Sequence, residues 1–417
     1  MANSLLTLNM ITREALRLWK NEYSLLAHVD TQYDDSYTRS GAKIGTALRI
    51  RLPNDYTVRT GPAASPQDTQ EQSITLTVST QKGVDVSFSE VERTMTLDDY
   101  SKRVLAPMVN VLIGSVATDV MSGAEGGSSN FTANVDSANN IITPRADDWL
   151  NAGAILDLNS APRTNRKIIA DPLTMARTVS SLAGLFNPSG AIGTQYDTAM
   201  VKNALGFDWY IDQTVIKHTT GTAPATTGAP TTSMTTVSGA NQSGLSVTVA
   251  ALTGTLAVGD VVFISSVNAV NRITKASTQT PRQFVITAAA AAGATSISIY
   301  PAIVGPTYVP GTGYVQSQYQ TVDSLPANGA NIYSAVNGSA VYRKNLAFVP
   351  EAIAMATADM EIPRGVHEAE REEYEGISLR MITAYNIMTD QMITRMDVLY
   401  GWIWLRPEWV VVIGDAI

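Results

Sequence analysis

Apolar residues near the start of the chain recur at the spacing of one helix face. Ile11, Leu18 and Leu25 are seven residues apart, so they fall on the same side of an α-helix. Charged side chains occupy the other faces, and the apolar stripe therefore needs a partner surface on this chain or on a neighbour. The pattern predicts a helix at the start of the chain.

The next long segment alternates apolar and polar residues, which is typical of β-strands. The alternation is clear at 74–79 and again at 84–89. Between 52 and 71 the chain is rich in Pro, Gly, Asn, Asp, Thr and Gln instead, which predicts a long loop between strand arms. A loop of this length with so few apolar residues usually serves something beyond its own domain.

Residues 96–121 predict a long, broadly apolar helix. Thr96 followed by two aspartates is a helix start, because the carboxylates oppose the helix dipole. Apolar residues every four positions predict burial along much of the helix, and Gly123 marks its end. Pro107 predicts a kink, or a break near Arg103.

The remainder of the chain, apart from its centre, reads as strands and helices. Small polar residues at 123–140 indicate surface turns, and the charged run at 367–375 is expected to be a loop. Asp171-Pro172 caps a helix that ends near Asn187-Pro188. Strands are predicted at 167–170, 207–216, 345–349, 377–384, 392–405 and 409–413.

Between residues 219 and 340 the chain almost stops using charge. A Thr/Gly/Ala/Ser/Val-rich block of domain length inside a more ordinary chain predicts an inserted β module. Short alternating stretches with Gly and Pro turns predict a small barrel or sandwich. The ionisable acids and bases of the block are Asp260, Arg272, Lys275, Arg282 and Asp323.

Composition narrows the classes of function. The chain has 417 residues, 45% of them apolar, with a net charge of −8 and a pI near 5.0. This acidic balance argues against tight duplex nucleic-acid binding, which needs clustered basic residues. There is no cysteine, and we expect neither a signal peptide nor a membrane span, because the apolar stretches are too short.

The search for chemistry finds no constellation that supports catalysis. The chain has three histidines, and none has a metal-ligand partner at helical spacing; His367-Glu368 is followed by Arg371 where a zincin needs its second histidine. The carboxylate pair at 98–99 is explained by helix capping, and the pairs at 34–35 and 147–148 are expected in polar loops. We predict no catalytic, cofactor-binding or metal-binding residue, no cofactor, and no enzyme activity.

Aromatic residues concentrate near the end of the chain. Trp402, Trp404 and Trp409 accompany Tyr400 in the predicted closing strands. A base-stacking platform needs basic neighbours, which are missing here, so a packed core or a subunit interface is the preferred interpretation.

The order of these features resembles a known family. The run from Lys82 to Glu92 leads into Leu97-Asp-Asp-Tyr100 and the long helix, and Ile168-Ile-Ala-Asp-Pro172 forms a strand–helix junction. The Gly259-Asp260 turn within 256–263 and the closing strands at 377–413 complete the set. Together they resemble the major capsid proteins of tailed bacteriophages, with the Hong Kong 97-type fold, in the subgroup whose central domain carries an inserted β domain.

The resemblance implies an α+β fold with named parts. These are an N-terminal arm, an extended E-loop, a peripheral domain with a spine helix and closing strands, an axial domain, and an inserted all-β, barrel-like domain. In the same order, the implied limits are 1–40, 41–80, 81–148 plus 385–417, 149–218 plus 341–384, and 219–340.

The resemblance also implies a function. The protein is expected to assemble with itself, as hexamers and pentamers, into the icosahedral shell around a tailed phage's double-stranded DNA, without sequence-specific contacts to that DNA. Scaffolding protein and portal are the implied partners, the virion is the implied location, and assembly is expected in the host bacterial cytoplasm. The expected subunit-interface residues are Ile11, Leu18, Leu25, Arg49, Arg51 and Arg59.

Two rival functions remain open at this point, and one departure from the subgroup is visible. The rivals are a surface or tail adhesin with a Thr-rich carbohydrate-binding β module, and a hydrolase that uses Asp and Glu. Inserted domains in the subgroup can use acidic loop residues between capsomers, but residues 219–240 contain none. We therefore expect this module to touch neighbouring capsomers without ion pairs.

Overall fold

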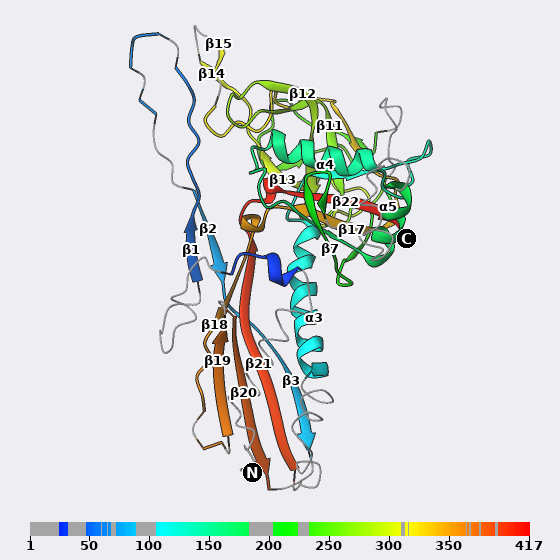
Figure 1. Cartoon of the computed structure of the whole chain (residues 1–417). Coiled ribbons are helices and arrows are strands. Elements are labelled where there is room, and N and C mark those ends of the chain that lie inside the picture. The colour runs from blue at the N-terminus through cyan, green and yellow to red at the C-terminus, as the bar shows by residue number, and fades with distance from the viewer. Residues whose placement is uncertain are drawn as a thin grey trace. The chain divides into compact units, whose positions relative to one another are not determined.

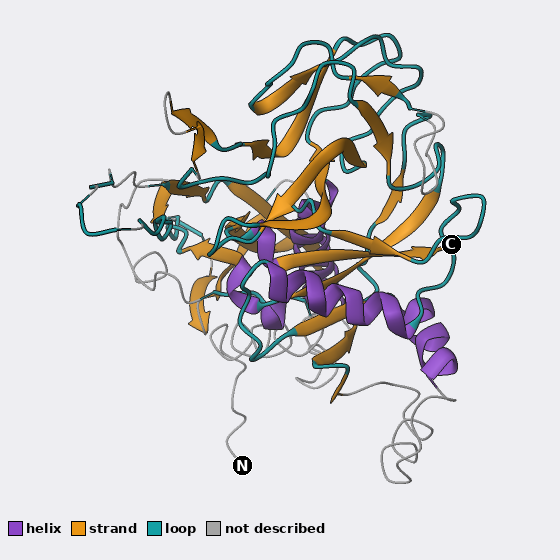
Figure 2. Ribbon diagram, turned by 90° about the horizontal axis from the view of Figure 1, so that it is seen from above, coloured by secondary structure: helices purple, strands orange, loops and turns teal. Residues whose placement is uncertain are grey.

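The chain forms two compact units in the computed structural model. Unit 1 comprises Met1–Arg51, Ser73–Met121 and Ile353–Leu405, and unit 2 comprises Leu52–Gln72, Ser122–Ala352 and Arg406–Ile417. Strands predominate over helices in the part of the chain that the structure describes, which confirms the predicted α+β class (Figures 1 and 2). The described residues are 25–31, 47–59, 61–64, 66–67, 72–88, 106–182, 203–223, 233–309, 313–315, 317–363, 365–366, 368–374, 377–387 and 391–417.

A five-stranded antiparallel sheet forms the body of unit 1. Its longest strand, β21 (Gln391–Trp404), pairs with β3 (Thr80–Phe88), β18 (Ile353–Ala358) and β20 (Ile377–Asn386). The strands predicted at 84–89, 377–384 and 392–405 are therefore confirmed.

The strand β19 (Glu368–Tyr374) corrects the loop predicted at 367–375. The segment carries charge at most positions, so it shows no apolar alternation, yet all seven of its residues pair with β20. It lies at the end of the strand order. Edge strands carry charge because it discourages pairing with further strands, and the pairing is therefore invisible to a search for apolar periodicity.

The helix α3 (Ala106–Ser122) lies beside β3 and β21 (Figure 1). It ends before Gly123, as predicted, while the predicted start at 96–105 lies outside the described residues. Pro107 is the second residue of the described helix, and the predicted break near Arg103 lies outside the described residues. The predicted burial is confirmed along one side of the helix, at Met108, Val109, Leu112, Ile113, Val116 and Val120.

The two strand arms of the predicted loop pair with each other. β1 (Ala47–Arg51) runs antiparallel to β2 (Ser73–Thr77), and their inward residues join a small core with Ala354 and Leu405. A 3-10 turn, η1 (Leu26–His28), precedes them. The arm predicted upstream of it lies outside the described residues.

The main sheet of unit 2 has seven strands. They are connected in the order β4-β22-β17-β5-β7-β6, and β8 also pairs with β17. The pairings of β5 with β7 and of β22 with β4 are parallel. The strands are β4 (Phe131–Ala133), β5 (Lys167–Ala170), β6 (Asn203–Ala204), β7 (Phe207–Ile211), β8 (Lys217–Thr219), β17 (Val341–Phe348) and β22 (Val410–Ala416).

Two helices and a tryptophan pair build the core against this sheet. Trp149 of α4 (Ala146–Leu158) meets Trp209 edge to face, with ring centroids 4.7 Å apart. The helix α5 (Pro172–Leu182) starts as predicted, because the Asp171 carboxylate accepts a hydrogen bond from the Leu173 N–H at 3.0 Å.

Three sequence expectations in this unit are wrong. The turn region predicted at 123–140 contains buried Ser128 and Asn130, whose side chains donate to the Val410 carbonyl at 2.7 and 3.1 Å. The strand predicted at 207–216 ends at Ile211. The carboxylates at 147–148 lie in the first turn of α4 rather than in a loop, where the Asp148 side chain caps the helix.

The charge-poor block folds into a closed antiparallel barrel. Six strands follow the order β10-β13-β12-β11-β16-β9. The first and last are joined by a bridge between Val237 and Val249, with flanking backbone hydrogen bonds of 2.8 and 3.0 Å. The barrel strands are β9 (Thr235–Thr236), β10 (Gly244–Thr248), β11 (Val261–Val270), β12 (Ser277–Ile286), β13 (Ser296–Ile303) and β16 (Asn331–Ser334).

The interior of the barrel is its own hydrophobic core. Phe284, Val262 and Ile299 are among the residues that fill it, all nearly inaccessible to solvent. A separate hairpin, β14 (Thr307–Val309) with β15 (Gly313–Val315), follows β13. Because Thr219 of β8 and Val341 of β17 are direct pairing partners, the whole block leaves and re-enters the main sheet at one point.

Candidate functional site

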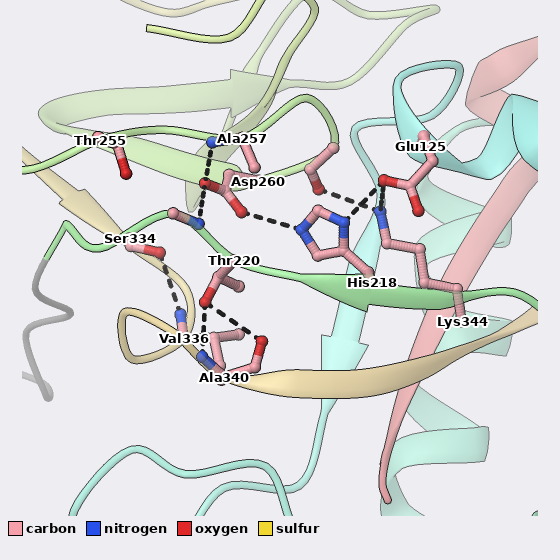
Figure 3. Close-up of polar contacts among 12 residues, drawn as sticks. Glu125, His218, Thr220, Thr255, Ala257, Asp260, Ser334, Val336, Ala340 and Lys344 are labelled. Atoms are coloured by element: carbon pink, nitrogen blue, oxygen red, sulfur yellow. Dashed lines mark hydrogen bonds and ion pairs between the residues drawn. The ribbon is translucent and has the colours of Figure 1, made fainter. Parts of the chain in front are cut away.

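Four charged side chains meet where the barrel leaves the sheet (Figure 3). They are Glu125, His218, Asp260 and Lys344, and we call this cluster the joint. Glu125 lies in a 3-10 turn, His218 on β8 and Lys344 on β17, whereas Asp260 belongs to the barrel, directly before β11. The joint therefore links three segments of the host sheet region to the charge-poor block.

His218 is held between two carboxylates. Its Nδ1 lies 2.7 Å from Glu125 Oε2, and its Nε2 lies 2.9 Å from Asp260 Oδ1. Carboxylates only accept hydrogen bonds, so both ring nitrogens must carry a proton for both contacts to form. The geometry thus requires the imidazolium cation, inside a site where the histidine side chain is only 2% exposed.

The pKa directions agree with this geometry. Burial acts to lower the pKa of His218, but the hydrogen bonds to Asp260 and Glu125 outweigh it and raise that pKa above its ordinary value. Burial acts to raise the pKa of Glu125, and the contacts with His218 and Lys344 outweigh it and lower that pKa. For Lys344, burial dominates and lowers the pKa.

The second cation of the joint is tied mainly by backbone oxygens. Lys344 Nζ donates to the carbonyls of Ala124 at 3.3 Å and Gly259 at 3.2 Å, and lies 3.5 Å from Glu125 Oε2. Two cations thus face two carboxylates. Buried charges of this kind are tolerated because each is paired and hydrogen-bonded.

The turn that presents Asp260 requires glycine before it. Gly259 has a φ of +93°, and a Cβ there would meet the Glu125 carbonyl oxygen at 2.2 Å and Lys344 Nζ at 2.6 Å. Asp260 Oδ2 also accepts backbone N–H bonds from Gly221 at 3.0 Å and Ala257 at 2.8 Å. These backbone hydrogen bonds therefore orient the Asp260 carboxylate independently of its contact with His218.

Neutral contacts extend the joint. Gln283 of β12 forms a two-way amide pair with Phe131 of β4, through bonds of 2.7 Å to its oxygen and 2.8 Å from its nitrogen. At the crossing of the two connecting segments, the Thr220 hydroxyl donates to the Asn337 carbonyl at 2.9 Å and accepts from the Ala340 N–H at 2.8 Å. Barrel and sheet are thus joined by fixed polar contacts in addition to the covalent connections.

A second charged cluster lies on the β11–β12 connection, and we call it the tip site. Lys275 Nζ is 3.1 Å from Asp55 Oδ2, and Arg272 Nε is 3.5 Å from Asp55 Oδ1. Arg272 also pairs with Glu408 through Nη1. Burial acts to lower the pKa of Arg272, but the Glu408 and Asp55 carboxylates outweigh it and raise that pKa.

These two clusters account for most of the charge in the block. Asp260 serves the joint, Arg272 and Lys275 serve the tip site, and Asp323 is bound within the barrel by Asn268 and Ser277. Four of the five charges noted in the sequence therefore have partners within the same chain, whereas Arg282 Nε is buried without a hydrogen-bond partner among the described residues.

In the joint, the two carboxylates bind opposite nitrogens of one imidazole, and among the described residues no group of His, Asp or Glu side chains is arranged to hold a metal ion. In the same part of the chain no helix is long and apolar enough to cross a membrane.

The expected interface residues are placed in different surroundings. Arg49, Arg51 and Arg59 are exposed, with Arg49 Nε donating to Ser73 Oγ at 2.8 Å. Leu25 is fully buried, while Ile11 and Leu18 lie outside the described residues. The structure therefore places the three arginines at the surface but does not bring the whole set together.

The aromatic residues near the end of the chain are packed rather than displayed. Tyr400 is fully buried and its hydroxyl donates to Asp119, while Trp404 is buried with its Nε1 donating to the Val120 carbonyl at 3.4 Å. Trp409 lies under the guanidinium of Arg406, 4.4 Å from the ring centre. The preferred interpretation of a packed core holds for Tyr400 and Trp404.

Sequence reasoning missed the joint and the tip site. Glu125 and Asp260 are 93 and 42 residues from His218, so no spacing rule connects them. One available signal was that Asp260 is an isolated acid following a glycine in an otherwise uncharged run. A lone charge in such a setting indicates a specific partner, because burying an unpaired charge is costly.

A family model described as "P22 coat protein - gene protein 5" matches residues 35–414. The match spans most of the sequence, so the chain belongs to the P22 coat protein family. It is a phage major capsid protein, which assembles with copies of itself into the shell and is located in the virion.

Solved structures with low sequence identity are also similar to the chain. One, from Mycobacterium phage Che8, is 11% identical, with a TM-score of 0.46 and coverage of 99% of this chain and 95% of that one. The capsid of Cyanophage P-SCSP1u is 11% identical, with a TM-score of 0.44 and coverage of 92% and 87%. No curated protein matches the chain. The family match confirms the predicted phage capsid protein over the adhesin and hydrolase alternatives.

Proposed function

We propose that copies of this chain assemble as hexamers and pentamers of an icosahedral shell enclosing double-stranded DNA, with no catalytic role. Scaffolding protein and portal are the proposed partners, and the host bacterial cytoplasm is the proposed place of assembly. The acidic balance of the chain, a net charge of −8, supports a shell that does not grip the packaged polyanion.

The proposal assigns a role to each part of the chain. Residues 1–40 form the N-terminal arm, 41–80 the E-loop, 81–148 plus 385–417 the peripheral domain, and 149–218 plus 341–384 the axial domain. Residues 219–340 are the inserted β domain, fastened by the joint. The closed barrel with its own core supports this last assignment, because it is a self-contained packing unit.

One observation carries the assembly role of the E-loop region. Arg49, Arg51 and Arg59 are exposed, and Tyr56 and Val58 are 57% and 93% exposed on the same segment. Tyr56 and Val58 are close to Arg59 in the sequence, and exposed apolar side chains beside a bidentate donor are typical of contact surfaces between proteins. The partner proposed for this surface is a second copy of the chain.

Charge reversal of the three arginines tests the proposal. The change is Arg49→Glu with Arg51→Glu and Arg59→Glu, and the control is Arg163→Glu at a side chain that is 81% exposed on unit 2. We expect the triple variant to keep its melting temperature but to lose closed shells by electron microscopy, while the control assembles. A triple variant that builds shells as the unaltered protein does would contradict the role of this surface.

A further inference from the structure

The tip site has the features of a specific binding site for one carboxylate, that of Asp55. Asp55 is bound by Lys275 and Arg272, Gln318 Nε2 donates to the Asp55 carbonyl oxygen, and the Tyr319 hydroxyl lies 3.5 Å from Asn54 Oδ1. Two cations, an amide and a phenol from separate barrel segments thus converge on two consecutive residues. A chance surface contact would not recruit four groups from two connections.

Because Lys275 is buried, its ammonium group needs a carboxylate partner. The Lys275 side chain is 2% exposed, whereas Asp55 is 22% exposed. An ammonium at that depth needs a carboxylate, because an uncompensated buried charge is strongly unfavourable. The site therefore demands an acidic residue from whichever segment covers it.

The backbone at Lys275 supports the same conclusion. Lys275 has a φ of +56°, a left-handed conformation that costs a residue with a side chain about 1–2 kcal/mol relative to the right-handed one. Its N–H donates to the Asn271 carbonyl at 2.8 Å, and the Asn271 side chain accepts from the N–H groups of Ile273 and Thr274 at 2.9 and 3.0 Å. A turn this closely bonded fixes the lysine in place beneath the loop.

Partly buried and exposed side chains alternate along residues 55–58 of the loop. Asp55 and Thr57 are partly buried, and the Thr57 N–H donates to the Gln67 side chain at 3.0 Å. Tyr56 and Val58 are exposed between and beyond them. In an extended segment successive side chains point to opposite sides, so holding Asp55 turns Tyr56 and Val58 outward.

We propose that Arg272 and Lys275 bind Asp55 of their own chain, and that the barrel thereby presents Tyr56 and Val58 of the E-loop to a second copy. The barrel is thus a holder that sets the loop before subunits meet. This inference rests on the proposed role of the loop in assembly. It also explains why Arg272 and Lys275, two of the few basic residues of the charge-poor block, lie next to this loop.

Cross-linking of isotope-mixed shells tests whether the contact is made within one chain. Shells are assembled from equal amounts of ¹⁴N and ¹⁵N protein and treated with a carbodiimide. The reagent activates the Asp55 carboxyl, the Lys275 amine displaces it to form an amide, and the carbodiimide leaves as its urea, having taken up the elements of water. Trypsin then yields residues 52–59 joined to residues 273–282, a product that mass spectrometry identifies. We expect both halves to carry the same isotope.

Mixed-isotope products as frequent as same-isotope products would overturn the proposal, because the loop would then dock on a neighbour. Shells without any link between these fragments would overturn it as well. Failure of the assembly role looks different: the unaltered protein forms no shells, while the link within the monomer can still be measured.

Charge exchange provides an independent measurement. Asp55→Lys and Lys275→Asp alone should each lose shells, and the two changes in one chain should restore them. Co-expression of the two single variants should not restore them, since each chain then carries a mismatch with itself. The control Asp85→Asn, at a carboxylate 61% exposed, should assemble normally; rescue by co-expression, or full assembly of both single variants, would contradict the holder.

Discussion

The imidazole of His218 connects segments that lie far apart in the sequence. Its burial is unfavourable for a cation, and the two carboxylates offset that cost through short, charge-assisted hydrogen bonds. Removing one partner of such a group leaves an uncompensated buried charge, which costs about 3–5 kcal/mol. The joint therefore stabilises the attachment of the barrel to the sheet only while His218 is protonated and its two carboxylate partners are ionised.

Stability should fall as pH rises through neutrality because of His218. Its pKa in the folded protein is raised above the ordinary value of 6.5, so between these values the folded chain binds a proton that the unfolded chain has lost. The unfolding free energy is then complete below about 6.5 and decreases above it. Urea unfolding of the monomer between about pH 6 and 8 measures the effect.

The variant His218→Gln serves as the control for this prediction. It keeps a polar side chain but cannot titrate, and the other histidines are common to both proteins. The difference between the two pH curves isolates the joint, in which Glu125, Asp260, Lys344 and the ring of Tyr342 surround the imidazole. Parallel curves would show that His218 is not the cation. The lowered pKa of Lys344 acts in the opposite direction, at alkaline pH below about 10.5.

Gly259 and Gly293 give a matched pair for the turn of the joint. Both have positive φ, +93° and +83°, but a Cβ at Gly293 meets nothing within 4 Å. We expect Gly293→Ala to cost about 1 kcal/mol for its backbone conformation alone. Gly259→Ala should cost about 3 kcal/mol or more, because its Cβ collides with a backbone oxygen. Equal losses of unfolding free energy would contradict the close approach at Gly259.

At the residue scale, the sequence carried the inventory of charges but not their partners. The five charges of the block were recognised as exceptional, yet the bonds of Asp260 and Lys275 join residues 42 and 220 positions apart. Such pairs depend on how sheets and loops pack, and no local pattern encodes them. The sequence consequently contained no indication of the partners of His218.

Elements with apolar periodicity were predictable, and elements built on polar contacts were not. The strand at 167–170 is buried at every residue and was predicted, as were the closing strands. The strand β19 and the segment around Ser128 were missed, because edge pairing and side-chain bonds to the Val410 carbonyl hold them. Apolar periodicity reports burial, and these segments are ordered by hydrogen bonds.

The barrel can be removed as an element because its ends meet. Thr219 and Val341 are pairing partners, so residues 220–340 can be replaced by Asn-Gly, which favours the tight turn between paired strands. We expect the shortened chain to have a lower melting temperature and to form few or misshapen shells. The reason is that the joint and the hydrogen bonds between Gln283 and Phe131 are lost.

Asp260→Asn is the intermediate control for that excision. It retains the barrel and its covalent connections and removes only one charge of the joint. We expect a melting temperature between those of the unaltered and shortened proteins. A shortened chain that is as stable as the full protein, with shells of the same size, would show that the barrel has no part in folding or assembly.

For the whole molecule, the distribution of charge limits how copies can meet. The barrel uses Asp260, Arg272 and Lys275 on its own chain, and the chain as a whole is acidic. Contacts between capsomers through the barrel are therefore expected to rely on hydroxyls, backbone groups and apolar atoms. In the proposed assembly, the exposed Arg49, Arg51 and Arg59 are expected to supply ion pairs between copies instead.

Electron microscopy of the unaltered protein, purified or co-expressed with a scaffolding partner, tests the central claim most directly. The account predicts closed icosahedral shells built from copies of this chain. A protein that remains monomeric at high concentration, even with that partner present, would contradict it.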